Sequence, residues 1–170
     1  MRGHLIIAGL ILVAAAFLWN VLKKERILQE GENVLLALAP VDPRSLMQGD
    51  YMVLRYHIAD QIAEQLSKDE RKTPVDGTLV LGVDTHGVGT FRRLQDAGTP
   101  LVKGETLLRY RLRGDRIQLG AESFLFQEGS ADTYALARYG ELRVDEDGSS
   151  ILVGLRDKDL KVLGAEQRQH

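Results

Sequence analysis

Residues 105–120 read ETLLRYRLRGDRIQLG and carry the clearest structural pattern in this chain of 170 residues. Side chains of two kinds alternate along the run. One face has Thr106, Leu108, Tyr110 and Leu112, and the other has Leu107, Arg109, Arg111 and Arg113. Because a period of two belongs to a β-strand, the pattern predicts a strand with one face in the core and the other mostly in water. RGDR then forms a hairpin turn.

Further strands are predicted wherever similar runs are bounded by turn residues. These runs are 33–41, 51–57, 78–84, 87–95 and a last hairpin over 140–155 that turns at DEDGS. Runs 78–84 and 87–95 form a hairpin around a THG turn, in which Gly87 suits a positive φ. Two short helices are predicted, over 58–70 and over 130–140, the second with Ser130 as a candidate cap. We therefore expect a mainly β fold with two short helices, arranged as a compact antiparallel barrel or sandwich.

Composition limits the possible functions. The chain is 44% hydrophobic and 27% charged, which is typical of one folded domain. A formal net charge of -2 gives no broad basic surface for nucleic acid. With no cysteine, disulfides, thiolate metal sites and a cysteine nucleophile are excluded. The four histidines lack metal-ligand spacing, so we expect no metal and no cofactor.

The N-terminal region differs from the rest of the chain. Residues 5–22 read LIIAGLILVAAAFLWNVL, an apolar run with Asn20 as its one strongly polar side chain. Such a run is about long enough, as a helix, to cross a hydrocarbon core of roughly 30 Å. We expect an anchor with a juxtamembrane segment over 1–30, a β-rich domain over 31–164 and a polar tail over 165–170. The alternative is a cleaved signal peptide with AAA at 14–16, although the apolar run continues beyond it.

Residues 49–56, GDYMVLRY, form a motif that has local structural uses. Gly49 suits a positive φ, and Asp50 is able to accept from loop amides or to pair with Arg44. The candidate site residues around the motif are Asp42, Arg44, Gly49, Asp50, Tyr51, Leu54 and Tyr56. From Tyr51 onward both faces carry large apolar groups, which favours a central strand. The motif is therefore interpreted as a hinge into a core strand, with a binding groove floored by Tyr51, Tyr56 and Asp50 as the alternative.

GDYMVLRY resembles the bacterial GDYXXLXY family at every fixed position, and VDPRSLMQ and FLFQEG also resemble that family, so that the similarity spans about 33–155. The resemblance implies a small membrane-anchored protein and no particular chemistry. SLMQGDY also resembles part of a box of membrane-anchored signal peptidases, but Val41 stands where their nucleophilic serine would be.

Two arguments about the side of the membrane on which the domain lies disagree with each other. Lys23, Lys24 and Arg26 follow the apolar run, and Arg2 precedes it, so the positive-inside count favours a cytoplasmic domain. Bacterial single-pass proteins with a short N-terminal tail more often export the domain. We expect an inner-membrane protein with a periplasmic domain.

The arginine stripe is the patch that we would test for binding. Arg109, Arg111 and Arg113 are able to meet anionic lipid or an acidic partner, although cross-strand pairing with acids such as Asp145 or Glu146 is commoner. We expect a binding or assembly module that partners another membrane protein. The alternative is a membrane-anchored hydrolase with an unrecognised site.

Overall fold

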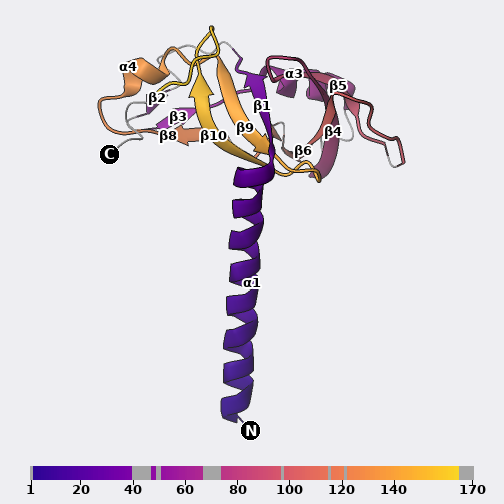
Figure 1. Ribbon diagram of the computed structural model, residues 1–170, viewed down its shortest axis with the longest axis vertical. Helices are drawn as coiled ribbons and strands as arrows, with labels where there is room; N and C mark the ends of the chain where they lie inside the picture. Colours follow the sequence, from indigo (N-terminus) through magenta and orange to yellow (C-terminus); the bar gives the residue numbers. More distant parts are fainter. Residues whose placement is uncertain are drawn as a thin grey trace.

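The computed structural model describes residues 2–39, 47–48, 51–66, 74–96, 98–114, 116–120 and 122–164. The fold is mainly β. A long N-terminal helix precedes two sheets, and two further helices lie between strands (Figure 1). In chain order the elements are α1 (Arg2–Glu30), β1 (Glu32–Ala37), β2 (Met47–Gln48), β3 (Tyr51–Val53), α3 (His57–Gln65), β4 (Val75–Val83), β5 (Val88–Leu94), β6 (Glu105–Arg113), β7 (Arg116–Gln118), β8 (Ser123–Leu125), α4 (Ala131–Tyr134), β9 (Tyr139–Val144) and β10 (Ser150–Arg156).

The larger sheet has seven strands in the order β10-β9-β1-β5-β4-β6-β7 and curls into a half-barrel. The expectation of a mainly β fold is confirmed. The sheet differs from a closed antiparallel barrel or sandwich in two ways: β10 and β7 end it without pairing with each other, and β1 runs parallel to β5, with Leu35 opposite Val88. Strand β1 lies between β9 and β5, and its residues Val34, Leu35 and Leu36 are all buried, as in a strand covered on both faces.

Strand β6 behaves as its pattern predicts. Thr106, Leu108, Tyr110 and Leu112 are buried, whereas Arg109, Arg111 and Arg113 are exposed. Its buried face joins the core with Leu79 and Leu81 of β4, and α3 adds Ile58 and Ile62. One continuous core therefore lies inside the curl of the sheet.

Two predicted hairpins are confirmed. Strands β4 and β5 pair antiparallel around a turn in which the Asp84 carboxylate accepts from the His86 and Val88 amides, both at 2.8 Å, and Gly87 has φ +81°. Strands β9 and β10 pair across the DEDGS turn. The predicted second helix is only the four residues of α4, and Ser130 stands at its N-cap without a side-chain capping bond.

The smaller sheet has three strands in the order β2-β3-β8, so β3 is central, as expected. The expectation that both of its faces are buried is wrong. Met52 is 2% exposed, but Tyr51 and Val53 are 36% and 37% exposed, because nothing in the described part of the chain covers that face. The strand also ends at Val53, since α3 begins at His57.

Helix α1 projects from the domain, and its last two turns contact the domain (Figure 1). Ile27 is 4% exposed, Lys23 forms an ion pair with Asp147 at 3.0 Å, and Arg143 donates to the Gly31 carbonyl at 3.0 Å. Along the projecting part the exposed large apolar side chains are Ile6, Ile7, Leu10, Ile11, Leu12, Val13, Phe17, Leu18, Trp19, Val21 and Leu22. Among the side chains that the structure describes, which in α1 leave out residues 2–5 and Ala8, no helix is long and apolar enough to span a membrane.

Candidate binding site

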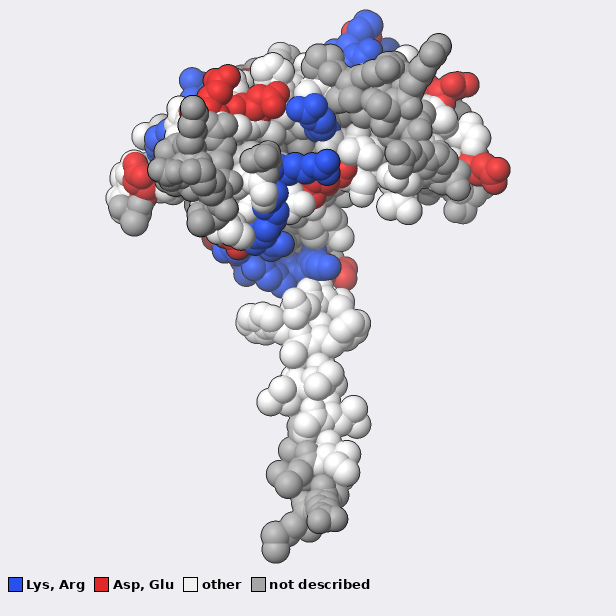
Figure 2. All heavy atoms as spheres, turned by 180° about the vertical axis from the view of Figure 1, so that it is seen from behind, with Lys and Arg blue, Asp and Glu red and all other residues white. Residues whose placement is uncertain are grey.

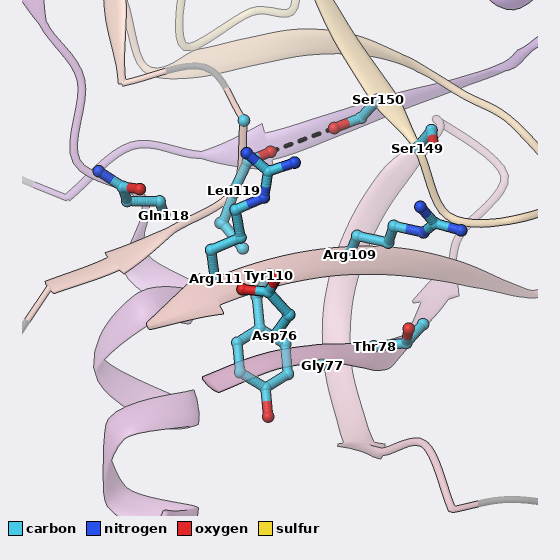
Figure 3. Close-up of a pocket in the computed structure, with 11 residues that line it drawn as sticks. Asp76, Gly77, Thr78, Arg109, Tyr110, Arg111, Gln118, Leu119, Ser149 and Ser150 are labelled. Atoms are coloured by element: carbon cyan, nitrogen blue, oxygen red, sulfur yellow. Dashed lines mark hydrogen bonds between the residues drawn. The ribbon is translucent and has the colours of Figure 1, made fainter. Parts of the chain in front are cut away.

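A cleft of about 480 Å³ lies between the strands β4, β6 and β7 and the start of β10 (Figure 3). We call it the arginine cleft. Its lining residues are Asp76, Gly77, Thr78, Arg109, Tyr110, Arg111, Gln118, Leu119, Gly120, Ser149 and Ser150. It contains two of the three arginines of the stripe that the sequence singles out.

Strand register builds one wall of the cleft. Thr78 of β4 is opposite Arg109 of β6, and Gln118 of β7 is opposite Arg111. Cross-strand partners point to the same face of a sheet, so these four polar side chains share the face that is turned away from the core. The close-up shows Arg111 extending toward Leu119, and Arg109 toward Ser149.

The β9–β10 turn builds the other wall. The Arg109 amide donates to the Gly148 carbonyl at 2.8 Å, which holds the turn against β6. Gly148 has φ +79°, and a Cβ there would lie 3.1 Å from the Arg109 nitrogen, so the close approach needs glycine. The Ser150 hydroxyl donates to the Leu119 carbonyl at 3.1 Å, the dashed line of Figure 3. This bond bridges the half-barrel where β7 ends and β10 begins.

Asp147 joins the cleft to helix α1. Its carboxylate lies 3.0 Å from Lys23 Nζ and 3.2 Å from Arg109 Nη2, and its carbonyl accepts from Arg109 Nε at 3.0 Å. Partial burial acts to raise the pKa of Asp147, but hydrogen bonds from Ser149 and Lys23, with the charge of Arg109, outweigh it and hold the pKa well below its usual range. The cleft and the end of α1 therefore share one carboxylate.

The three arginines of the stripe differ in their partners. Arg109 pairs with Asp147, and Arg113 pairs with Asp76 at 2.6 Å. The sequence predicted pairing with acids such as Asp145 or Glu146. The arginines do pair with acids, but the β9–β10 turn presents Asp147 to Arg109. Within the described ranges Arg111 makes no ion pair and no side-chain hydrogen bond. Its guanidinium donors are therefore not taken up by another side chain in the part of the chain that the structure describes.

Figure 2 shows that Lys and Arg side chains gather in a column from the top of α1 up across the domain. The Lys23–Asp147–Arg109 contacts connect the helix end to β6, and Arg111 and Arg113 continue along that strand. The column is locally basic although the chain as a whole is slightly acidic, at -2.

The residues of the GDYMVLRY motif lie elsewhere. Leu54 and Tyr56 are buried in the core, and burial, with the charge of Glu122, raises the pKa of Tyr56. Tyr51 lies on the exposed face of β3, so the two tyrosines do not share a surface. Asp42, Arg44, Gly49 and Asp50 lie outside the described residues. Leu54 and Tyr56 line a second cleft, of about 560 Å³, that adjoins β7.

Sequence reasoning found Arg109, Arg111 and Arg113 and missed the rest of the cleft. Thr78, Gln118, Ser149 and Ser150 come from three other strands and a turn, and only the register brings them to Arg111. The one available signal was the DEDGS turn, whose glycine predicts a tight reversal but not the strand that it meets.

The arginine cleft is lined by guanidinium, hydroxyl and amide groups and by the carboxylate of Asp76. Ser150 donates to a main-chain carbonyl, and the residues that line the cleft include no histidine or lysine to act as a base. In the part of the chain that the structure describes, no group of three acidic or histidine side chains is placed to hold a metal ion. Guanidinium, hydroxyl and amide groups together suit a carboxylate or a similar anion.

A mainly β domain joined to a long N-terminal helix, with Leu54 and Tyr56 of the motif in its core, defines the class of this protein. The chain belongs to the GDYXXLXY protein family, whose model matches residues 13–155. No curated protein and no solved structure matches it.

Proposed function

We propose that this protein is a single-pass membrane-anchored binding module whose arginine cleft takes an acidic segment of another membrane protein. The observation that carries the proposal is the shared carboxylate of Asp147, which binds Lys23 at the end of α1 and Arg109 in the cleft. Through this contact the binding surface lies directly beside the end of the anchor. The proposed location is the bacterial inner membrane, with the domain in the periplasm.

The anchor is residues 5–22. Eighteen helical residues extend roughly 27 Å, against a hydrocarbon core of roughly 30 Å. The described apolar side chains of this stretch are exposed and make no core for the domain, which favours lipid as their surroundings. Trp19 and Lys23 stand at its domain end, where aromatic and basic residues meet the lipid headgroups.

The cleft favours a peptide carboxylate over a lipid phosphate. The guanidinium of Arg111, which has no ion pair with another described residue, is able to bind a carboxylate in bidentate fashion. Thr78, Gln118 and Ser149 add oxygens that accept hydrogen bonds, and a peptide brings N–H donors to them whereas a phosphodiester brings none.

Co-purification from membranes tests this function. We expect the full-length protein to retain a stoichiometric integral-membrane partner in mild detergent, and Arg111→Glu to lose it. Lys103→Glu is the matched control, because Lys103 is exposed, lies outside the cleft and undergoes the same reversal of charge. A partner that survives Arg111→Glu unchanged would contradict the proposal, as would loss of the partner in both variants.

Topology needs its own test. Alkaline phosphatase fused to the C-terminus should be active, because it forms its disulfides only in an oxidising compartment. Alkaline carbonate should leave the protein in the membrane pellet. An inactive phosphatase with a fluorescent cytoplasmic reporter would show that the positive-inside count is right and the periplasmic location wrong.

A further inference from the structure

Among the described residues, β10 and β8 are each the last strand of a sheet, and residues of both strands line the same gap. Strand β10 ends the larger sheet and β8 ends the smaller one. The gap between them measures about 490 Å³ and shares Gly120 and Ser150 with the lining of the arginine cleft. We infer that this gap receives one extended segment of a partner protein, which pairs with both edges and continues the half-barrel into the smaller sheet.

The hydrogen-bonding pattern between β8 and β3 supports the inference. The Leu54 amide donates to the Glu122 carbonyl at 2.8 Å, and Met52 is opposite Phe124. In an antiparallel ladder, residues whose backbone groups bond to the neighbouring strand alternate with residues whose backbone groups point away from it. Because Glu122 bonds to Leu54, the backbone groups of Ser123 and Leu125 point away from β3. Both residues line the gap.

Strand β10 offers matching groups. The Asp145 amide donates to the Ser149 carbonyl at 2.8 Å, and Ile151 is opposite Arg143, so the backbone groups of Ser150 and Leu152 point away from β9. Outside the strand ladders, no backbone hydrogen bond between described residues involves Ser123, Leu125 or Leu152. Two rows of donors and acceptors thus face one space.

The protein covers the rest of the β10 edge itself. The Leu163 amide donates to the Leu155 carbonyl at 2.9 Å, and Val162 bridges to Arg156. Open strand edges invite pairing and are usually covered or charged. The described residues 157–163 protect the end of β10 and leave its beginning, opposite β8, available for strand addition.

Side chains around the gap indicate the chemistry of the segment. Phe124 and Leu152 pack against the core but are only partly buried, and Leu125 is 77% exposed. An inserted strand that alternates apolar and polar residues would cover the first two. Lys24 of α1 lines the gap and has no ion pair among the described residues, so an acid at that end of the segment complements it. That the partner is a membrane protein rests on the proposed function; the addition of a strand does not.

Photo-crosslinking in native membranes tests the inference on the full-length protein. A photoreactive amino acid is placed at Leu125 on β8, at Ile151 on β10 and, as a control, at Val102, which is exposed and does not line the gap. We expect Leu125 and Ile151 to label the same partner segment, at positions within about four residues, since a strand advances roughly 3.3 Å per residue. Val102 should not label it.

A charge variant adds a quantitative readout. Leu125→Asp should reduce labelling from Ile151 about tenfold or more, whereas Val102→Asp should leave it unchanged. Both side chains are exposed, so neither variant should alter the melting temperature. Labelling of residues 165–170, of a second copy of this chain, of two unrelated segments, or of nothing would overturn the inference. Strand labelling that persists in Arg111→Glu would support it even if the arginine cleft has no acidic partner.

Discussion

The two sheets of this domain are held together very differently. In the larger sheet, β4 and β6 pair over eight residue positions, and their inward leucines Leu79, Leu81, Leu108 and Leu112 are at most 1% exposed. In the smaller sheet, β3 pairs with β8 over three positions and with β2 over two. Stability is therefore expected to reside in the larger sheet, and the family motif contributes β3, Tyr51–Val53, to the smaller one.

The smaller sheet also brings together distant parts of the family resemblance. GDYMVLRY contributes β3, and FLFQEG overlaps β8, where Phe124 lies opposite Met52. Strands that are short and exposed on one face contribute little stability by themselves. The comparison teaches that this sheet needs support from the core through Leu54 and Tyr56, and that β8 is its edge strand in the described part of the chain.

The largest effect is expected in the larger sheet. Leu108→Ala should reduce the free energy of unfolding by about 3 to 5 kcal/mol, because a fully buried leucine leaves a cavity in a rigid ladder. Denaturant melts of a truncated protein that starts at Val21 would measure it. A start at Gly31 would remove Ile27, which is buried, and Lys23, which binds Asp147. Arg111→Ala, exposed on the same strand, is the control and should cost less than about 0.5 kcal/mol.

The sequence predicted what is local and missed what depends on register. The alternation in β6 and the turns at Gly87 and Gly148 identify strands and hairpins, because each is set by neighbouring residues. The parallel contact of Leu35 with Val88 joins strands more than fifty residues apart, and no short pattern encodes it. For the same reason the stripe Arg109, Arg111 and Arg113 was visible in the sequence and its companions were not.

The second prediction probes the smaller sheet. Leu54→Ala should cost about 2 to 4 kcal/mol, since Leu54 follows β3 and is buried against the common core. If the smaller sheet is the weaker unit, amides of β3 and β8 should exchange with deuterium faster than those of β4 and β6, and the difference should widen in this variant. If the amides of both sheets were equally protected from exchange, the two sheets would not differ in stability.

The third prediction concerns the stability of the protein at low pH. The carboxylate of Asp147 has a lowered pKa and links Arg109 of the larger sheet to Lys23 of α1. Asp147 has a folded-state pKa below that of the unfolded chain, so its stabilisation is complete above an ordinary pKa of about 3.9 and is lost as the pH falls through the lowered value. Asp147→Asn should cost about 1 kcal/mol at neutral pH, a value discounted for its partial exposure.

The same variant should also lose less stability than the wild type between about pH 5 and pH 2, since the titrating group is gone. Melts at a series of pH values would show the two curves converging in acid. Asp159→Asn is the control, because its ion pair joins it to the neighbouring residue Lys158 on the surface and involves no residue of α1. An Asp147→Asn curve that runs parallel to the wild type at all pH values would mean that Asp147 does not link α1 to the sheet.

The smallest effect is expected at the open edge of the smaller sheet. Leu125→Ala should change the free energy of unfolding of the isolated protein by less than about 0.5 kcal/mol, because a side chain that is 77% exposed loses little burial. In membranes that contain the partner, the same variant should lower the crosslinking yield from Ile151, since the apolar contact is then made by the inserted strand. A loss above about 1 kcal/mol in the isolated protein would mean that Leu125 is already covered. The gap would then be filled by the chain itself, and both sheets would belong to one closed structure.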